Sequence, residues 1–382
     1  MITYGKHFID KADKKAILST LSSGWLTQGP KVIQFESEIK KKFGSKYCSV
    51  VSNGTAALHL IAIALGWGKN DTILCSPISF ISGANSALYV GASPDFVDID
   101  KETYNIDIFK LEKKIIFYLK KKKKIKAIIV TDFAGNPANW SSLRKISKKY
   151  KIKIINDNCH ALGASYKKDT KYAIKYADVV IHSYHPVKNI TSGEGGAILT
   201  NDKKLYSKVN RLRSHGIKRS NVSWFYEMIE IGYNYRLTDI QSALGVSQLK
   251  KLDKFVKKRN QIAKIYSQNF NSNIFKKPEI NENNLHSFHL YPLLIKFNKL
   301  KITKSLFLKK MLAVGIRLQV HYIPTYLHPF YKKKFKFKKS NFPVSENFYK
   351  EEISLPIYYS LRKYEVYKVI NSIEKICKKN LK

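Results

Sequence analysis

Lys188 and Asp157 are the two residues whose types and surroundings indicate chemistry most directly. Asp157 ends an apolar stretch, and Lys188 closes Ser183-Tyr-His-Pro-Val-Lys188 just after the next apolar stretch. A lysine amine can form a Schiff base with the aldehyde of pyridoxal phosphate, and a carboxylate can keep the cofactor's ring nitrogen protonated. The pair therefore indicates pyridoxal phosphate chemistry, provided that the fold brings the two side chains together.

The turn Ser52-Asn-Gly-Thr-Ala56 could supply a phosphate site for such a cofactor. Gly54 allows close backbone approach, and Thr55 with the first helical N–H groups can hold a phosphate at the positive end of a helix. Ser183 can add a hydroxyl to the same phosphate. An ordinary helix cap explains the turn equally well.

Two further features accompany the lysine and the aspartate. His160, three residues after Asp157, either bonds the cofactor's phenolic oxygen or is a satisfied core histidine. The glycines of Gly193-Glu-Gly-Gly-Ala197 suit a tight loop that passes near the cofactor lysine, or a plain hairpin turn. No Gly-x-Gly-x-x-Gly pattern follows the first predicted strand, which argues against a nicotinamide enzyme.

The elements that must position these residues are strands and helices that alternate over the first 250 residues. The predicted strands are 47–52, 71–76, 94–97, 127–131, 152–156, 177–182 and 197–200. The predicted helices are 55–65, 81–90 and 143–150. Such alternation predicts a mostly parallel α/β sheet flanked by helices, in which ligands bind beyond the carboxyl ends of the strands.

The pattern changes beyond about residue 245. Residues 246–270 read as one long basic helix, followed by the segment 290–297 and a helix near 303–314. A lysine- and aromatic-rich loop is predicted over 322–342, and a closing amphipathic helix over 364–378. We therefore expect a large α/β domain over 1–245 and a smaller C-terminal α+β domain over 246–382.

Charge is the most unusual bulk property of the chain. Its 382 residues include 69 Lys and Arg against 28 Asp and Glu, a formal net charge of +41. The basic residues are mostly lysines spread along the chain, which favours attraction of anionic small ligands over a nucleic-acid partner. Residues 331–339 interleave lysine with aromatics, as single-strand binders do, but a loop near an active-site mouth is the preferred interpretation.

The cysteines and the apolar stretches indicate in which cellular compartment the protein is located. Cys48, Cys75, Cys159 and Cys377 are scattered without a Cys-x-x-Cys spacing, so we expect no metal site and a reducing cytoplasm. No apolar stretch approaches the length of a membrane span, and the N-terminus lacks the order of a signal peptide. The expected location is therefore cytoplasmic, with no membrane partner.

Many short motifs give the chain a resemblance to a known family. From about residue 10 to about residue 360 it resembles the DegT/DnrJ/EryC1/StrS sugar-nucleotide aminotransferases, which are fold-type I enzymes dependent on pyridoxal phosphate. The matching segments are Leu26-Thr-Gln-Gly-Pro30, Ser52-Asn-Gly-Thr-Ala-Ala-Leu58, Ser76-Pro-Ile-Ser-Phe80, Asp132-Phe-Ala-Gly135, Asp157 to Gly163, Ser183 to Lys188, Gly193 to Ala197, Arg213-Ser-His-Gly216, Gly232 to Asp239, Gln241 to Gly245 and Val320-His-Tyr-Ile-Pro324.

The resemblance implies a role for each candidate residue. Lys188 would be the Schiff-base lysine and proton shuttle, Asp157 would pair with the pyridine nitrogen, and His160 would lie near the phenolic oxygen. The other implied cofactor contacts are phosphate binding by Gly54, Thr55, Ala56 and Ser183, and ring stacking by Phe80. Without the resemblance, Phe80 would be interpreted as ordinary core packing.

The resemblance also implies a homodimer with shared active sites. Asn234 matches the asparagine that reaches the cofactor phosphate of the neighbouring subunit, although by itself it would be interpreted as a helix cap. The residues matched to the sugar-nucleotide site, which could equally be loop residues, are Thr27, Gln28, His321 and Tyr322.

Within the family, the chain is most similar to the members that act in pseudaminic acid biosynthesis. The stretches that carry this likeness are His185-Pro-Val-Lys188, Thr191 to Gly196, Val320 to Pro324 and Glu352-Ile-Ser-Leu-Pro356. It implies transfer of the amino group of L-glutamate to C4 of a UDP-linked 4-keto-6-deoxy-2-acetamido sugar.

Two alternatives stay open. One is amination of another keto sugar nucleotide, at C3 or C4 and on dTDP, GDP or UDP. A remote one is a non-catalytic, basic nucleic-acid-binding protein. One branch of the family carries a histidine in place of the lysine and performs dehydration, so Lys188 favours transamination.

Overall fold

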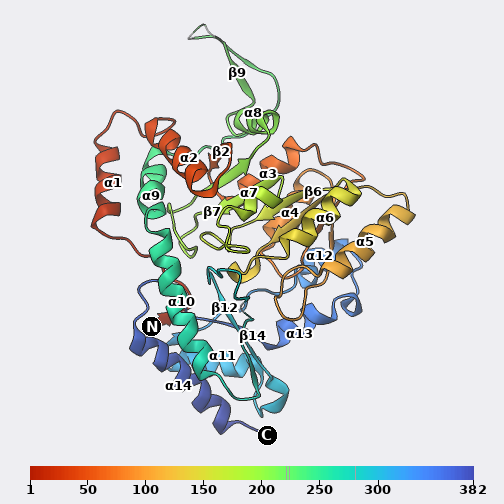
Figure 1. Ribbon diagram of the computed structural model, residues 1–382, viewed down its shortest axis with the longest axis vertical. Coiled ribbons are helices and arrows are strands. Elements are labelled where there is room, and N and C mark those ends of the chain that lie inside the picture. The colour runs from red at the N-terminus through yellow and green to blue at the C-terminus, as the bar shows by residue number, and fades with distance from the viewer. Residues whose placement is uncertain (221, 223, 280) are drawn as a thin grey trace.

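The computed structural model describes residues 1–382 except 221, 223 and 280, and its centre is a seven-stranded sheet (Figure 1). The strand order is β2-β8-β7-β6-β5-β3-β4. The strands are β2 (Tyr47–Val51), β3 (Thr72–Cys75), β4 (Ser93–Phe96), β5 (Ile125–Thr131), β6 (Lys153–Asp157), β7 (Val179–Ser183) and β8 (Gly196–Thr200). All neighbouring pairs are parallel except the two that β8 makes with β2 and β7. The predicted mostly parallel sheet is confirmed.

Helices cover both faces of this sheet because its strands are apolar on both sides. Successive residues of one strand enter different cores: Ile154 packs in one cluster and Ile155 in the other, as the two-residue period of a strand requires. The first cluster includes residues of α2 (Pro30–Phe43), α5 (Ile108–Lys120), α6 (Trp140–Tyr150), α7 (Tyr172–Tyr176) and α9 (Asp239–Leu249). The second includes residues of α3 (Gly54–Ala64), α4 (Ser82–Tyr89) and α8 (Lys203–Leu212).

A smaller antiparallel sheet forms the centre of the C-terminal part. Its strands are β11 (Phe275–Lys276), β12 (Tyr291–Ile295) and β14 (Glu352–Leu355), in that order. The helices of this part are α10 (Leu252–Asn269), α11 (Lys304–Ala313), α13 (Pro343–Glu351) and α14 (Lys363–Lys379). Near the N-terminus, β1 (Ile2–Thr3) pairs with β13 (Ile316–Arg317), so the start of the chain packs with its C-terminal part. The domain division at residue 245 stays a prediction.

Two sequence predictions of the C-terminal half are wrong. The single helix over 246–270 is two helices, since α9 ends at Leu249 and α10 begins at Leu252. A capping box between Thr238 and Gln241 starts α9 upstream of the predicted helix, and Lys250 and Lys251 separate α9 from α10.

The segment 322–342 is not simply a loop. It contains α12 (Pro329–Lys334) and the 3-10 turns Thr325–Leu327 and Lys339–Asn341; two further 3-10 turns elsewhere are Phe133–Gly135 and Phe297–Lys299. Tyr326, Tyr331 and Phe342 are buried with Phe96 in the second cluster. The aromatics that suggested a binding loop therefore act as core residues.

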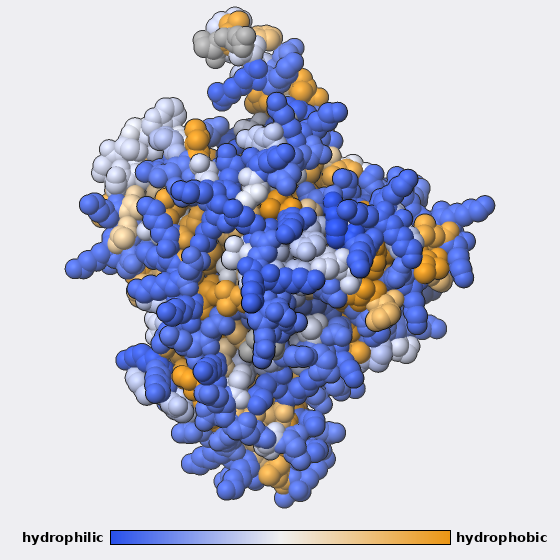
Figure 2. All heavy atoms as spheres, in the orientation of Figure 1, coloured by the Kyte–Doolittle hydropathy of each residue, from blue (hydrophilic) through white to orange (hydrophobic). Residues whose placement is uncertain are grey.

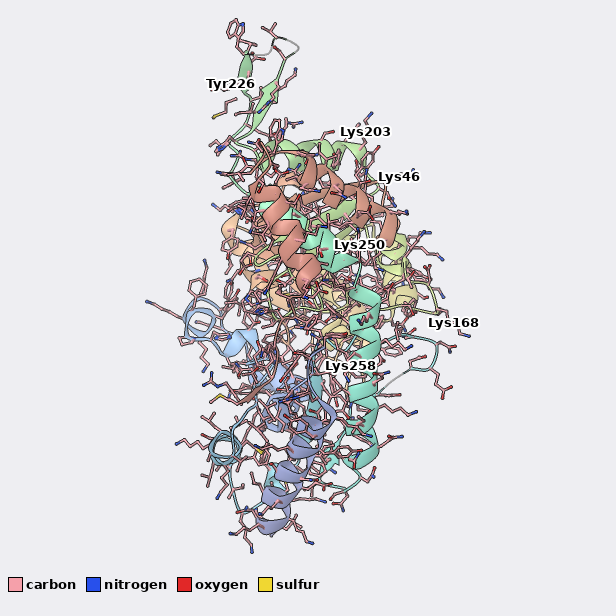
Figure 3. All side chains as sticks on the ribbon, turned by 90° about the vertical axis from the view of Figure 1, so that its left-hand side faces the viewer. Lys46, Lys168, Lys203, Tyr226, Lys250 and Lys258 are labelled. Atoms are coloured by element: carbon pink, nitrogen blue, oxygen red, sulfur yellow. The ribbon has the colours of Figure 1, made fainter. Side chains whose placement is uncertain are left out.

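A hairpin projects from the body of the molecule. It consists of β9 (Ile217–Arg219) and β10 (Tyr226–Met228), next to α8, with α1 (Lys11–Leu21) and α2 at the same end of the molecule (Figures 1 and 3). Along the hairpin, Trp224, Tyr226 and Met228 are 77%, 62% and 66% exposed. Elsewhere the visible surface is mostly hydrophilic, with apolar residues in scattered groups (Figure 2).

Two bulk features of the sequence are also visible in the structure. Among the described residues, no helix combines the length and the apolar character that crossing a membrane requires. All four cysteines are free thiols.

Candidate active site

A cavity of about 1060 Å³ lies where the large sheet meets the C-terminal part. Its floor contains the carboxyl ends of β6 and β7 and the start of α3, and the segment 319–323 contributes to its wall. The predicted site residues that line it are Gly54, Thr55, Ala56, Phe80, Asp157, His160, Ser183, Lys188, His321 and Tyr322. The fold therefore brings together Lys188, Asp157 and the predicted phosphate turn.

Asp157 is the last residue of β6 and is 5% exposed. One carboxylate oxygen accepts a hydrogen bond from the backbone N–H of Cys159 at 3.2 Å, and the other accepts from the Thr131 hydroxyl at 3.3 Å. Thr131 ends the neighbouring strand β5 and also bonds Ser79 at 3.0 Å. The carboxylate is thus held in one orientation from two sides.

Lys188 lies in the loop between the antiparallel strands β7 and β8. Its backbone N–H donates to the His185 carbonyl at 2.9 Å, and the side chain is half-buried in the cavity. Burial lowers the pKa of the Lys188 amine, while the nearby Cys159 and Asp157 act in the opposite direction. A lower pKa increases the fraction of free amine, which is the form that attacks a carbonyl or takes up a proton.

Hydrogen bonds hold the loop that carries Lys188 at several points. The Thr191 hydroxyl donates to the Tyr184 carbonyl at 2.9 Å and accepts from the N–H of Gly193 at 2.9 Å. The Asn189 amide donates to the Leu162 carbonyl at 3.0 Å. Gly193 has a φ of 85°, a backbone conformation that favours glycine, in the segment that joins the antiparallel neighbours β7 and β8.

The start of α3 forms a concave turn beside Ser183. The Asn53 side chain caps the helix by accepting from the N–H of Ala56 at 2.7 Å, and the N–H groups before it are free of intrahelical partners. A Cβ on Gly54 would lie 3.1 Å from the Cβ of Ser183, and a Cβ on Gly196 would lie 2.6 Å from the backbone of Asn53. Glycine at both positions keeps this cradle open.

His160, three residues after the end of β6, and Tyr322 are in contact and both line the cavity. The Tyr322 hydroxyl lies 3.0 Å from Nε2 of His160, which is 2% exposed. Burial, with the charge of Lys188 next, holds the pKa of His160 well below its usual range. Its Nδ1 has no hydrogen-bond partner among the described residues. Phe80 is 53% exposed, with its ring centroid 6.3 Å from that of Tyr322.

Three predicted site residues lie outside this cavity. Thr27 and Gln28 line a separate cavity of about 910 Å³, and Thr27 also pairs with Thr238. Asn234 pairs with Ser214. Their assignment to the sugar nucleotide and to a partner's cofactor stays a prediction.

The sequence interpretation missed several cavity residues. His59 lies one helical turn after Thr55, its Nδ1 is 3.1 Å from the Tyr235 hydroxyl, and both line the cavity. The spacing of four residues on one helix was a usable signal for His59. Tyr4 had no such signal, because its position depends on the pairing of β1 with β13.

The residues present fit pyridoxal phosphate. The cavity offers a lysine amine, a buried carboxylate and an open cradle at a helix N-terminus beside a serine hydroxyl, which match the cofactor's aldehyde, ring nitrogen and phosphate. The unpartnered Nδ1 of His160 adds a buried polar atom that the protein itself does not satisfy. Over the described part of the chain, no group of His, Cys, Asp or Glu side chains could hold a metal ion.

Comparison with known proteins agrees with this geometry. The model of the DegT/DnrJ/EryC1/StrS aminotransferase family matches residues 7–374. A relative from Campylobacter jejuni, UDP-4-amino-4,6-dideoxy-N-acetyl-beta-L-altrosamine transaminase, is 42% identical over 358 residues, 93% of this chain and 92% of its own.

Two solved structures have the same fold. Helicobacter pylori PseC, an aminotransferase involved in the biosynthesis of pseudoaminic acid, superposes with a TM-score of 0.91 at 35% identity and 99% coverage of both chains. The sugar aminotransferase Spr1654 of Streptococcus pneumoniae, in its PMP form, gives a TM-score of 0.92 at 27% identity over 99% of this chain and 100% of its own; a PLP form is also known. The chain belongs to the DegT/DnrJ/EryC1/StrS aminotransferase family.

Proposed function

We propose that this aminotransferase uses pyridoxal phosphate to move the amino group of L-glutamate to C4 of a UDP-linked 4-keto-6-deoxy-2-acetamido sugar. The observation that carries the proposal is the convergence of Lys188 and Asp157 in one cavity, next to the N-terminus of α3. The names of the Campylobacter jejuni relative and of the Helicobacter pylori structure support this sugar. The PLP and PMP forms of Spr1654 support the cofactor.

The bound cofactor would supply an electron-accepting ring for the pair of electrons left when the amino acid loses its Cα proton. Lys188 would take that proton on Nζ. Burial lowers the pKa of its amine, so more of it is unprotonated and able to act as a base near neutral pH. In the second half of the reaction Lys188 would return a proton to the sugar carbon.

Asp157 would hold a proton between its carboxylate and the ring nitrogen. The Thr131 hydroxyl and the Cys159 N–H fix the carboxylate before the cofactor arrives, so no side-chain ordering is needed on binding. Gly54, Thr55, Ala56 and Ser183 would hold the phosphate at the start of α3.

The remaining cavity walls would bind the ring and the sugar. Phe80 would stack on the cofactor ring, His160 would face its phenolic oxygen, and His321 with Tyr322 would contact the sugar nucleotide. A second subunit would close the water-exposed mouth of the cavity. Asn234 would reach the phosphate of the cofactor bound in the partner subunit. The exposed apolar residues of the β9–β10 hairpin support such a homodimer. The expected location is the cytoplasm.

The test is an incubation of the protein with L-glutamate and UDP-, GDP- and dTDP-linked keto sugars, followed by NMR of the products. The expected product is a 4-amino sugar from the UDP-linked 2-acetamido substrate alone. In parallel, borohydride reduction with labelled reagent should mark Lys188 when the cofactor is present. Amination of only a GDP or dTDP sugar would refute the substrate, and absence of the label would refute the cofactor chemistry.

A further inference from the structure

Behind the cavity wall, a buried chain of hydrogen bonds connects β14 to the residue that precedes Tyr322. The Ser354 hydroxyl lies 2.5 Å from Oε1 of Glu352 and 2.8 Å from Nδ1 of His321. The backbone N–H of His321 donates to the other carboxyl oxygen of Glu352 at 2.9 Å. Glu352 and Ser354 are fully buried, and His321 is 7% exposed.

With a neutral imidazole, two arrangements of the protons give every hydrogen of these three side chains an acceptor within this hydrogen-bonded path, because the serine hydroxyl has one hydrogen to donate. If Glu352 is ionised, Ser354 donates to the carboxylate and must accept from Nδ1–H of His321. Nε2 then carries no proton and can only accept a hydrogen bond. If Glu352 is protonated, it donates to Ser354, Ser354 donates to Nδ1, and the ring proton is on Nε2. The backbone N–H of His321 is a donor in both cases and selects neither.

We propose that Glu352, acting through Ser354, sets the tautomer of His321 and so decides whether Nε2 offers the sugar a hydrogen-bond donor or an acceptor. The inference rests on the proposed function. His321 lines the cavity that contains Lys188, and Nδ1 is the ring nitrogen that bonds Ser354, so within the described residues Nε2 is the nitrogen left for a ligand. Glu352 and Ser354 are positioning residues, since neither lines the cavity.

The donor form suits the proposed substrate. A keto oxygen only accepts hydrogen bonds, and an N–H aimed at it stabilises the negative charge that develops when an amine attacks the carbonyl. A neutral imidazole can serve as this donor. His321 stays neutral, because burial lowers its pKa to about 3, with the charge of Lys188 acting in the same direction.

Glu352 is placed to change its protonation state near neutral pH. Burial raises the pKa of the Glu352 carboxyl towards neutral, although the ammonium of Lys304 on α11 favours the ionised form. The other titratable groups that influence the chain electrostatically, or pack against it, are Tyr4, Tyr104, Tyr322, Lys188, His160 and His289. In the neighbourhood of pH 7, the proton of Glu352 therefore decides between the two arrangements.

The decisive variant is Glu352→Gln, which fixes the donor form. The backbone N–H of His321 requires the amide oxygen at its side, so the amide NH₂ faces Ser354 and donates to it, as the protonated acid does. In the native protein, kcat/KM for the keto sugar should fall about 10-fold as pH rises from about 6 to about 9. A tenfold change is about what the loss of one hydrogen bond to the transition state costs. In Glu352→Gln this component of the pH profile should disappear.

Two companion variants separate this role from a structural one. Ser354→Ala breaks the hydrogen-bonded path between Glu352 and His321. It should therefore also remove the pH-dependent component of kcat/KM. Glu346→Gln makes the same change at a carboxyl on α13, away from the cavity, which accepts from the Tyr326 hydroxyl at 2.8 Å. This variant should keep the native pH profile of kcat/KM. The glutamate half-reaction does not involve the keto oxygen, so its pH profile should be the same in the native protein and in Glu352→Gln.

A direct readout is NMR of protein labelled with ¹⁵N-histidine, with the His321 signals assigned by the His321→Asn variant. The ring proton of His321 should move from Nε2 to Nδ1 as pH rises, and it should stay on Nε2 in Glu352→Gln. A His321 tautomer that does not change with pH in the native protein, or a native pH profile in Glu352→Gln, would overturn the inference. Failure of the native protein to aminate any sugar would overturn the proposed function instead. The pH dependence of the His321 tautomer would still test the hydrogen-bonded path from Glu352 through Ser354.

Discussion

Replacing Asp157 by Asn tests how much of the reaction depends on a fixed negative charge at the end of β6. The two carboxylate oxygens accept from Cys159 and Thr131, and an amide of the same shape leaves the fold in place but removes the charge. A hydrogen bond to a charged group contributes about 1.5–3 kcal/mol, and each 1.36 kcal/mol is tenfold in rate. The rate of the glutamate half-reaction should therefore fall roughly 10- to 100-fold.

Thr131→Val provides the graded comparison. It keeps the shape of the side chain and removes only the neutral hydroxyl at 3.3 Å from Asp157, so the expected cost is about 0.5–1.5 kcal/mol, or roughly 2- to 10-fold in rate. Asp253→Asn, an exposed aspartate paired with Lys42, is the control and should change nothing.

The assay is single-turnover spectroscopy of the cofactor after mixing with glutamate. Both variants are first saturated with cofactor, so that weaker binding does not appear as slower chemistry. A full native rate in Asp157→Asn would refute the assignment of the ring-nitrogen partner. A larger loss in Thr131→Val than in Asp157→Asn would show that orientation, not charge, is what the site requires.

Three further predictions follow from other parts of the structure. Lys188→Ala should abolish turnover and the borohydride label together; a variant that keeps either would contradict the role of the amine. Burial raises the pKa of Asp132 to about 6 from 3.8, so the folded protein binds its proton more tightly than the unfolded chain. Its contribution to the free energy of unfolding should therefore decrease by about 3 kcal/mol as pH rises from about 4 to about 6. Urea denaturation should show this component in the native protein and not in Asp132→Asn. Gly245→Ala would place a Cβ 2.5 Å from the ring of Phe35 and should lower the free energy of unfolding by about 1–3 kcal/mol. Gly24→Ala lies outside a helix, meets nothing within 4 Å and controls for the added methyl group alone, with an expected change near zero.

The strands and the helices that follow them could be predicted from the sequence because their patterns are local. The strand that ends at Asp157 and the helix that starts at Gly54 are each marked by an apolar run and a cap within a few residues. Their convergence followed from one rule about parallel sheets. The start of α9 at Asp239 also has a local signal, the capping box of Thr238 and Gln241, which the sequence interpretation did not use.

The residues contributed from a distance could not be predicted. The buried partnership of Glu352, Ser354 and His321 depends on how β14 lies beside the segment 319–323, and the Gln319–Ser354 pairing that fixes it joins residues far apart in sequence. Tyr326, Tyr331 and Phe342, which were expected in a loop, were interpreted wrongly for a related reason. Their burial depends on Phe96, which no local pattern connects to them.

The antiparallel strand β8 has a consequence for how Lys188 is held. It is bonded to β2 on one side and β7 on the other, and the loop that carries Lys188 connects β7 to β8. The loop that carries Lys188 is therefore anchored at its far end by a strand that is paired on both sides. The backbone at Lys188 is thus fixed relative to Asp157 at the end of the same sheet, and only the long lysine side chain has to move between the proton positions of the two half-reactions.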